Sequence, residues 1–325
     1  MDKDCGMRPT EVSVVCLSYN HHRYIEKCID SLLNQETSFQ YEIVVHDDAS
    51  QDGSASIIDR YVEKYPDKIK PVIQQENQYS KTGGNIRPFI APYVKGKYVA
   101  MCEGDDWWDD TSKLQKQWEY MESHPECSCC AHAVSVYNDA DGRDEGAICP
   151  SAVARNYNTA EIIEQDAPFG TNSIFMRAEF YLMPENYTDW GVGDFPTFIW
   201  LSQNGTVHFD PEEMSSYRYC SQGSWSESVC GSHAVRIKAN ERIIDGLSSI
   251  FESLTAEELA AAEKNILKRR LENASLNRDY RYLVSKEARR AISSLSLGEL
   301  AKLSMWLLGE NLYLKCKNAL KGGGH

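Results

Sequence analysis

The sequence of 325 residues predicts an α/β fold, a mostly parallel sheet flanked by helices, followed by a C-terminal helical region. Over residues 1–125, short apolar runs alternate with amphipathic helical patterns, a repetition typical of parallel sheets covered by helices. From residue 232 onward, the pattern changes to nearly pure helix. We therefore expect one α/β domain over residues 1–230 and a helical region over residues 231–325.

The elements of the first half follow from the spacing of their apolar residues. Runs rich in Val, Ile and Tyr predict strands, and apolar residues at intervals of three and four predict helices. In the first helix, for example, Ile25, Ile29 and Leu32 fall on one face. The expected strands are 12–20, 41–48, 69–77 and 97–106, and the expected helices are 23–35, 52–66 and 112–125, with a short broken helix within 83–96.

The middle of the chain, about residues 131–231, is less regular. It predicts short strands, loops and one helix that complete the same domain. The charge changes after this region, since residues 232–325 hold 16 Lys and Arg against 11 Asp and Glu, whereas the whole chain has a net charge of −14. The sequence thus predicts an acidic body with a basic C-terminal region.

Composition and charge restrict the class of protein. Apolar residues make up 42% and charged residues 25%, as in soluble globular proteins, and the net charge of −14 argues against a nucleic-acid partner. No apolar run approaches the roughly 18–20 residues that span a bilayer. The polar N-terminus lacks the apolar core of a signal peptide, and the 11 cysteines show no paired framework. We therefore expect a cytoplasmic protein with reduced thiols.

Acidic residues follow two of the expected strands at the point where each strand ends. Asp47 and Asp48 close one strand, and Glu103, Asp105 and Asp106 close another. Ligands of parallel sheets bind beyond the carboxyl ends of the strands, so these side chains should lie near one another. Clustered carboxylates favour a divalent ion such as Mg²⁺ or Mn²⁺, which commonly binds one or two carboxylates and substrate phosphates. The alternative is a solvated acidic loop.

Three segments in order, VSVVCLSYN, EIVVHDDASQDGS and KYVAMCEGDDWWDDTSKLQKQ, resemble the family-2 glycosyltransferases with the GT-A fold. That family shows an apolar strand ending in Tyr-Asn, an Asp-Asp-x-Ser-x-Asp-Gly segment and an acid-x-Asp-Asp motif before a helix. The match covers about residues 10–225. The resemblance implies an inverting enzyme that moves a sugar from a nucleotide-diphosphate donor, most simply a UDP-sugar, to a glycan or lipid-linked acceptor in surface polysaccharide synthesis.

The resemblance also assigns roles to residues that would hold the nucleoside of the donor. Ser18 and Tyr19 would border the base. Asp47 and Asp48 resemble the acid pair that binds uracil and ribose. Glu103 would lie near the ribose.

The same resemblance places the chemistry on later acids. Asp105 would hold Mn²⁺ or Mg²⁺ on the diphosphate, with Asp106 beside it, and the metal would stabilise negative charge on the departing nucleoside diphosphate. Asp194, just ahead of a helix, resembles the general base that takes the proton of the acceptor hydroxyl. The chain departs from the family in three places: Glu103 begins the motif where Asp is commoner, WWDD follows where a Pro often appears, and Cys220 stands where many relatives carry a His.

Several other residues admit two interpretations, a substrate contact or a purely structural role. Trp107 and Trp108 could stack on a sugar or base, or pack in the core. Cys127, Cys129 and Cys130 with His132 could bind zinc, but their run also fits a buried strand. The same two interpretations apply to His46, Arg218 and the loop 83–85. Asn172 and Ser173 are expected to contact the acceptor or the donor sugar.

The C-terminal helices also leave two interpretations open. Their basic clusters, and an apolar stripe with lysines nearby, could lie on an anionic membrane. The alternative is an ordinary helical subdomain or a homodimer contact. The clusters are Lys268–Arg270 and Arg289–Arg290, and the stripe comprises Leu300, Leu303, Trp306, Leu307 and Leu314 with Lys302, Lys315 and Lys317.

Two other functions compete with the transferase. A sugar-phosphate nucleotidylyltransferase would need a glycine-rich turn after the first strand, and the segment LSYNHHRYI lacks the glycines. A catalytically inactive protein that binds nucleotide sugars or serves as a scaffold would lack Asp105 or the base, and both Asp105 and Asp194 are present. Cys220 is the feature in favour of the inactive protein.

Overall fold

The structure is a computed structural model that describes residues 9–166, 168–293 and 295. The chain divides into two compact units, Met1–Ser228 and Val229–His325. Each unit has its own packing.

The first unit is built on one mixed sheet in the order β3-β2-β1-β4-β9-β6-β10-β5, with β7 paired to β6 and β8 paired to β10. The longest pairings, β1 with β2 and β4, β2 with β3, and β6 with β10, are parallel, and the antiparallel pairings are shorter. The predicted α/β fold is confirmed. The strands are β1 (Thr10–Ser18), β2 (Gln40–Asp47), β3 (Ile69–Ile73), β4 (Tyr98–Glu103), β5 (Trp107–Trp108), β6 (Cys127–Asn138), β7 (Arg143–Ile148), β8 (Arg155–Tyr157), β9 (Phe175–Arg177) and β10 (Thr206–Tyr219).

The middle of the chain is more regular than expected. β6 and β10 are the two longest strands of the sheet, with 12 and 14 residues. The alternation in β10 is obscured because the register shifts between Asp210 and Glu213 and again between Glu213 and Ser215. The prediction of a single helix here was wrong, since two α-helices, α6 (Thr159–Gln165) and α7 (Asp194–Gln203), lie between the strands.

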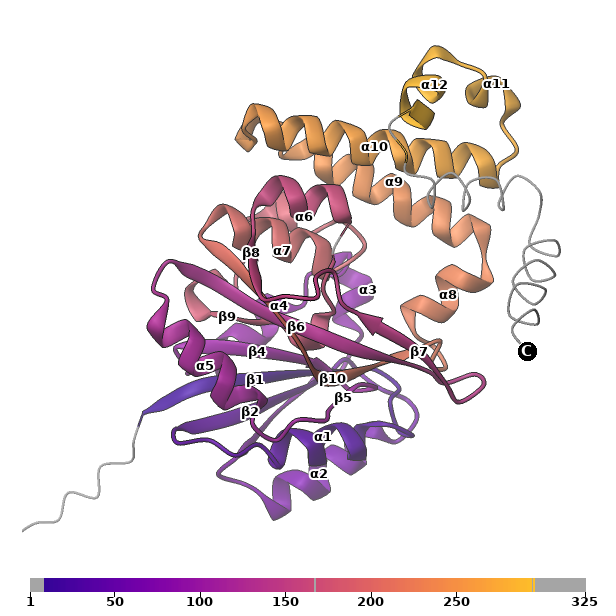
Figure 1. The fold of residues 1–325 in the computed structure, drawn as a ribbon. Coiled ribbons are helices and arrows are strands. Elements are labelled where there is room, and N and C mark those ends of the chain that lie inside the picture. The colour runs from indigo at the N-terminus through magenta and orange to yellow at the C-terminus, as the bar shows by residue number, and fades with distance from the viewer. Residues whose placement is uncertain (1–8, 167, 294, 296–325) are drawn as a thin grey trace, which may run out of the picture. The chain divides into compact units, whose positions relative to one another are not determined.

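Helices cover both faces of the sheet. α1 (Ile25–Leu33) and α2 (Ser54–Lys64) lie on one side, and α6 and α7 on the other (Figure 1). With α5 (Lys113–Ser123), α1 and α2 bury their predicted apolar stripes against the strands, as Ile29, Ile58 and Leu114 show. Shorter segments complete the unit: α3 (Gln78–Thr82), α4 (Arg87–Ile90), η1 (Ala91–Tyr93), η2 (Thr171–Ser173), η3 (Ala178–Phe180) and η4 (Glu185–Tyr187).

The second unit is helical. After α8 (Trp225–Gly231), which contains the division point, it comprises α9 (His233–Ser249), η5 (Phe251–Ser253), α10 (Ala256–Leu276), α11 (Tyr280–Leu283) and α12 (Lys286–Ser293). α10 begins with a capping box formed by Thr255 and Glu258.

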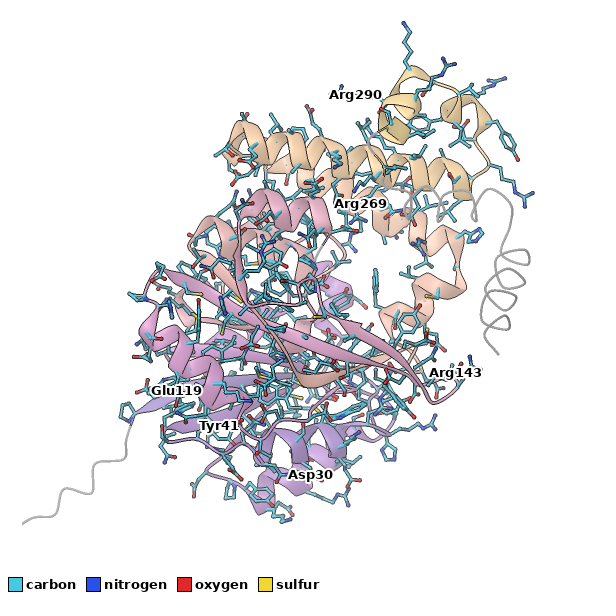
Figure 2. All side chains as sticks on the ribbon, in the orientation of Figure 1. Asp30, Tyr41, Glu119, Arg143, Arg269 and Arg290 are labelled. Carbon is cyan, nitrogen blue, oxygen red and sulfur yellow. The ribbon has the colours of Figure 1, made fainter. Side chains whose placement is uncertain are left out.

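One residue of the basic cluster Lys268–Arg270 serves the interior of this unit. Arg269 is buried on α10 (Figure 2), and it donates hydrogen bonds to Asn265 at 2.9 Å and to Asn240 of α9 at 2.8 Å. In the part of the chain that the structure describes, no helix is both long and apolar enough to span a membrane. The apolar stripe predicted between Leu300 and Lys317 lies outside the described residues.

Candidate active site

The carboxyl ends of the central strands converge at one edge of the sheet. β1 lies between β2 and β4, so Leu17 is in register with both His46 and Glu103, and Ser18 is in register with Asp47. β6 and β10 run in the same direction as β4, because β9 is antiparallel to both β4 and β6. Their ends therefore reach the same edge, and the acidic residues after β2 and β4 share it as the sequence predicted.

The carboxylates of the first acid pair accept hydrogen bonds from neighbouring segments of the chain itself. The carboxylate of Asp47 accepts hydrogen bonds from the N–H of Ser50 at 2.9 Å and from its hydroxyl at 2.6 Å. The carboxylate of Asp48 accepts from the N–H groups of Gln78 at 2.7 Å and Tyr79 at 2.9 Å. These two donors begin α3, so Asp48 fixes the start of that helix. Any contact of either aspartate with a nucleoside would share these oxygens.

The second acid pair faces the end of β10. Oδ2 of Asp105 accepts a hydrogen bond from the Ser221 hydroxyl at 2.6 Å, and Nε2 of His21 lies 3.8 Å from Oδ1. Oδ1 of Asp106 accepts from the N–H of Arg218 at 2.8 Å, whereas its Oδ2 is buried and has no partner among the described residues. A buried oxygen of this kind is costly unless a ligand, an ion or a proton satisfies it.

Arg218 closes this side of the site. It donates to the backbone oxygen of Asp105 at 2.9 Å and pairs with Asp139 at 2.7 Å. Its guanidinium also lies 4.6 Å from the ring centre of Tyr24 and 4.8 Å from that of Trp107. The structural interpretation of Arg218 is therefore the one that its contacts support, since its charge is matched by Asp139.

The electrostatics of the acid cluster are unfavourable without a cation. Burial raises the pKa of Glu103 to about 8, and the nearby charges of Asp105 and Asp194 add to the shift. Burial, followed by the charges of Asp105 and Glu103, holds the pKa of Asp106 well above its ordinary value, although Arg218 opposes the shift. A positive ligand would favour the ionised forms of these carboxyl groups.

A cleft of about 330 Å³ opens beside the cluster. Glu103 from the end of β4 and Asp194 from the start of α7 both line it, which brings together two acids 91 positions apart in the sequence. Most of the wall is apolar, and two aromatic residues, Tyr79 and Trp225, line it while remaining 45% and 52% exposed. An amphipathic ligand such as a sugar suits this mixture, because it presents both polar edges and apolar faces.

The predicted site residues thus fall into three groups. Glu103 and Asp194 line the cleft, while Asp105 and Asp106 lie beside Glu103 on the loop after β4. Asp47 and Asp48 are buried in the neighbouring loop. Ser18 is buried with no hydrogen-bond partner for its hydroxyl among the described residues, and Tyr19 is 45% exposed.

Most residues with two interpretations prove structural. Trp107 and Trp108 are buried, and the Nε1 atom of Trp108 donates to the backbone oxygen of Asn172. Asn172 and Ser173, which were expected to contact a sugar, are themselves buried, and their neighbour Thr171 lines the cleft. His46 is a core residue, and Gly84 lines the cleft within a turn at a φ of 111°. The three cysteines for which zinc binding was the alternative, Cys127, Cys129 and Cys130, are buried in β6, which confirms the strand interpretation.

No group of three or more His, Cys, Asp or Glu side chains within the described ranges is arranged to hold a metal ion. The oxygens present fit a different arrangement. Asp105 can provide one carboxylate ligand to a hard divalent ion, with the other ligands coming from a diphosphate and water. The buried Oδ2 of Asp106 and the raised pKa of Glu103 are consistent with a cation at this edge.

Sequence reasoning missed three residues of the site. Ser221 contacts Asp105, Tyr217 lines the cleft, and so does Arg87. Tyr217 and Arg218 point to opposite sides because successive residues of a strand alternate. The segment SYRYCS was considered only for Arg218 and Cys220, and the pairing of β10 with β5 was not predictable from it. Arg87 gave no signal, since it lies in a short proline-rich segment.

Comparison with known proteins identifies the family. Residues 13–184, more than half of the chain, match the family described as Glycosyl transferase family 2. The chain belongs to this family. The match contains the two acid pairs and ends before Asp194 and β10.

Two curated relatives illustrate the range of this glycosyltransferase family. The uncharacterized protein Rv1520 of Mycobacterium tuberculosis is 32% identical over 218 residues, 66% of this chain and 60% of that protein. The chain therefore spans about 60% of the length of the first curated relatives that it matches. The Escherichia coli protein WfaP, a UDP-Glc:alpha-D-GlcNAc-diphosphoundecaprenol beta-1,3-glucosyltransferase, is 31% identical over 112 residues, 34% of this chain and 41% of that protein.

Solved structures confirm the GT-A glycosyltransferase fold. Residues 1–349 of Staphylococcus aureus TarS, in complex with UDP-GlcNAc, superpose with a TM-score of 0.60 at 18% identity, covering 87% of this chain and 78% of that chain. The mannosyltransferase PcManGT of Pyrobaculum calidifontis, in complex with GDP-Man and Mn²⁺, gives a TM-score of 0.57 at 20% identity, covering 95% and 81%. At these identities, the likeness concerns the fold alone.

Proposed function

We propose that this chain is an inverting glycosyltransferase that moves a sugar from a nucleotide-diphosphate donor, a UDP-sugar in the simplest case, to an acceptor hydroxyl. The observation that carries the proposal is the cleft in which Glu103 at the end of β4 meets Asp194 at the start of α7. The Asp105–Asp106 pair follows Glu103 at its edge. The comparisons support a nucleotide-sugar donor, since TarS binds UDP-GlcNAc and PcManGT binds GDP-Man.

Asp194 is the proposed general base. It begins α7 at the cleft, and its Oδ1 accepts from the N–H of Phe195 at 2.7 Å, which directs the carboxylate at the helix start. A base in this position would take the proton of the acceptor hydroxyl as it attacks the anomeric carbon from the side opposite the nucleotide. Direct displacement of this kind inverts the anomeric carbon and needs a single base.

Asp105 is the proposed residue for a divalent ion, Mn²⁺ or Mg²⁺. When bound, such an ion offsets the negative charge that develops on the leaving nucleoside diphosphate. Ser221 orients the Asp105 carboxylate through its 2.6 Å hydrogen bond. Ser18, Tyr19, Asp47, Asp48 and Glu103 are the proposed surroundings of the nucleoside.

The acceptor is proposed to be a glycan or a lipid-linked sugar, in the synthesis of a surface polysaccharide. WfaP, whose name gives a diphosphoundecaprenol-linked acceptor, supports this class. Work at the cytoplasmic face of the membrane, contact with it through the C-terminal helices, and a homodimer are parts of the same proposal.

Calorimetric titration of the purified protein with UDP, in the presence and absence of Mn²⁺, tests the function. We expect Mn²⁺-dependent binding of UDP that is lost in Asp105→Ala. Binding should be retained in Asp59→Ala, because Asp59 is an exposed aspartate of α2 that does not line the cleft. Binding of GDP in place of UDP would keep the mechanism and change the donor. If no nucleoside diphosphate binds with any divalent ion, the proposal is wrong and a catalytically inactive scaffold protein takes its place.

A further inference from the structure

We propose that the cleft binds an acceptor sugar carrying an anionic group, a carboxylate or a phosphate, and that Arg87 recognises this group. The inference rests on the proposed transferase function and names the chemical class of its acceptor. It follows from an arginine whose charge has no acidic partner in the described part of the chain although it is more than nine-tenths buried.

The contacts of Arg87 are all neutral. One terminal nitrogen of its guanidinium donates to the backbone oxygen of Tyr181 at 2.8 Å, and the other donates to the hydroxyl of Thr197 at 2.6 Å. The guanidinium also lies 5.3 Å from the ring centre of Tyr181. No carboxylate among the described residues pairs with it, so the charge is held in place by neutral groups.

The comparison with Arg218 shows that this is unusual within the same unit. Both arginines are buried to a similar degree, at 9% and 8% exposed. Arg218 pairs with Asp139, whereas Arg87 has no such partner in the residues described. A buried charge without a counter-ion is costly, and a ligand that supplies the opposite charge removes the cost.

Arg87 lies where a ligand can reach it. It lines the 330 Å³ cleft together with Glu103 and Asp194, and it also lines an adjoining hollow of about 50 Å³ with Tyr79 and Gly84. A guanidinium that has no counter-ion and lines a ligand cleft is expected to bind an anionic oxygen group. It can bind such a group through two parallel hydrogen bonds.

The position of Arg87 relative to Asp194 favours the acceptor as the source of the anion. Thr197, which accepts from Arg87, donates in turn to the backbone oxygen of Gly193. Arg87 is thereby tied to the first turn of α7, one helical turn from Asp194. A sugar with its reactive hydroxyl at Asp194 can therefore present a substituent to Arg87, with the exposed rings of Tyr79 and Trp225 beside it.

Binding of simple glycosides tests the proposal. We would measure dissociation constants by calorimetric titration in the presence of saturating UDP and Mn²⁺, using methyl glucuronide, glucose 6-phosphate and neutral methyl glucoside. We expect at least one anionic sugar to bind about tenfold or more tightly than the neutral one, as one charge-assisted contact provides. The glucuronide and the phosphate distinguish the two sources of charge. Equal affinities for all three sugars would overturn the proposal.

Variants separate recognition of the anion from a structural role. In Arg87→Met the preference for the anionic sugar should fall to about onefold, while Arg87→Lys and Thr197→Val should keep it, since both retain a positive charge at position 87. Arg60→Met, on an exposed arginine of α2, is the matched control and should change nothing. If Thr197→Val and Arg87→Met lose affinity for charged and neutral sugars alike, Arg87 only braces α7 and the proposal is wrong.

Titration with UDP keeps this inference separate from the proposed function. Arg87→Met should bind UDP and Mn²⁺ as the unaltered protein does, which also shows that the variant is folded. A loss of UDP affinity in a variant whose thermal unfolding is unchanged would assign Arg87 to the donor diphosphate and overturn the inference. Failure of the unaltered protein to bind any nucleoside diphosphate would instead reject the transferase function itself.

Discussion

Two aspartate pairs that look alike in the sequence have opposite surroundings in the structure. Asp47–Asp48 and Asp105–Asp106 each follow a parallel strand at the same edge of the sheet. The carboxylates of the first pair accept four hydrogen bonds from Ser50, Gln78 and Tyr79. The second pair has one oxygen without a partner among the described residues, and its members and Glu103 repel one another.

The difference shows how a strand end becomes either a scaffold or a ligand site. Backbone N–H groups satisfy the first pair because α3 begins where Asp48 points, so those charges fix a loop. Among the described residues, no N–H group at the start of a helix donates to Asp105 or Asp106, and this loop lies close to β1, since the N–H of Gly104 donates to the backbone oxygen of Leu17 at 2.7 Å. The carboxylates of the second pair therefore remain available to bind a cation.

Asp105→Asn should produce the largest effect on function. The substitution keeps the shape of the side chain and removes the charge that would hold a divalent ion, so sugar transfer should fall about 10²–10³-fold in kcat/KM. The free energy of unfolding should not decrease, because one member of a repelling cluster is removed. Enzyme kinetics and urea unfolding measure the two quantities, with Asp59→Asn as the control. Equal loss of activity in the control would contradict the assignment.

Glu103→Gln should change the pH dependence of stability in metal-free protein. The pKa of Glu103 is raised to about 8 in the folded state, above its ordinary 4.5, so the folded protein keeps a proton that the unfolded chain releases. Its contribution to stability is present below about pH 4.5 and is lost as the pH rises through 8. The variant should match the unaltered protein at pH 4 and exceed its free energy of unfolding at pH 8.5 by at least about 1 kcal/mol. The same free energy of unfolding for both proteins at both pH values would contradict this prediction.

The sequence predicted the parallel half of the fold well because its signals are local. Strands β1, β2 and β4 carry short apolar runs that are mostly buried, and the helices between them carry clear apolar stripes. The remainder depends on pairings between distant segments. β10 contains Pro211 and three register shifts against β6, and β9 has three residues, so neither has a period from which a strand could be recognised.

The site residues that directly follow a strand were predictable from the sequence. The site residues that come from distant segments of the chain were not. The position of Glu103, Asp105 and Asp106 at the sheet edge follows from the end of β4. Asp194 was suggested by family resemblance, and the cleft that joins it to Glu103 needed the structure. Arg87 and Ser221 are ordinary residues in loops or short helices. Their roles depend on contacts across 110 and 116 positions, which no local pattern reports.

Asp48→Ala should lower stability, and Asp106→Asn should not. The first change leaves the N–H groups of Gln78 and Tyr79 without their acceptor, which costs about 1–2 kcal/mol in the free energy of unfolding. The second keeps an oxygen for the N–H of Arg218 while it removes a buried charge. Urea unfolding at pH 8 compares them. A loss of stability in Asp106→Asn as large as that in Asp48→Ala would remove the distinction between the two pairs.

Ser221→Ala and Cys220→Ala should have the smallest effects on UDP binding. They compare the serine that contacts Asp105 with the neighbouring cysteine, where the chain departs from its family. The hydroxyl of Ser221 donates to Asp105 at 2.6 Å, so its removal should weaken Mn²⁺-dependent UDP binding about fivefold, which corresponds to one hydrogen bond of about 1 kcal/mol. Cys220 has a φ of 57° and its N–H is bonded to Ser226, and alanine can keep both features. Calorimetry on the two variants should therefore show the larger loss for Ser221→Ala. The opposite order would mean that the Cys220 thiol, at the position of the family histidine, serves the metal and that Ser221 only supports the loop.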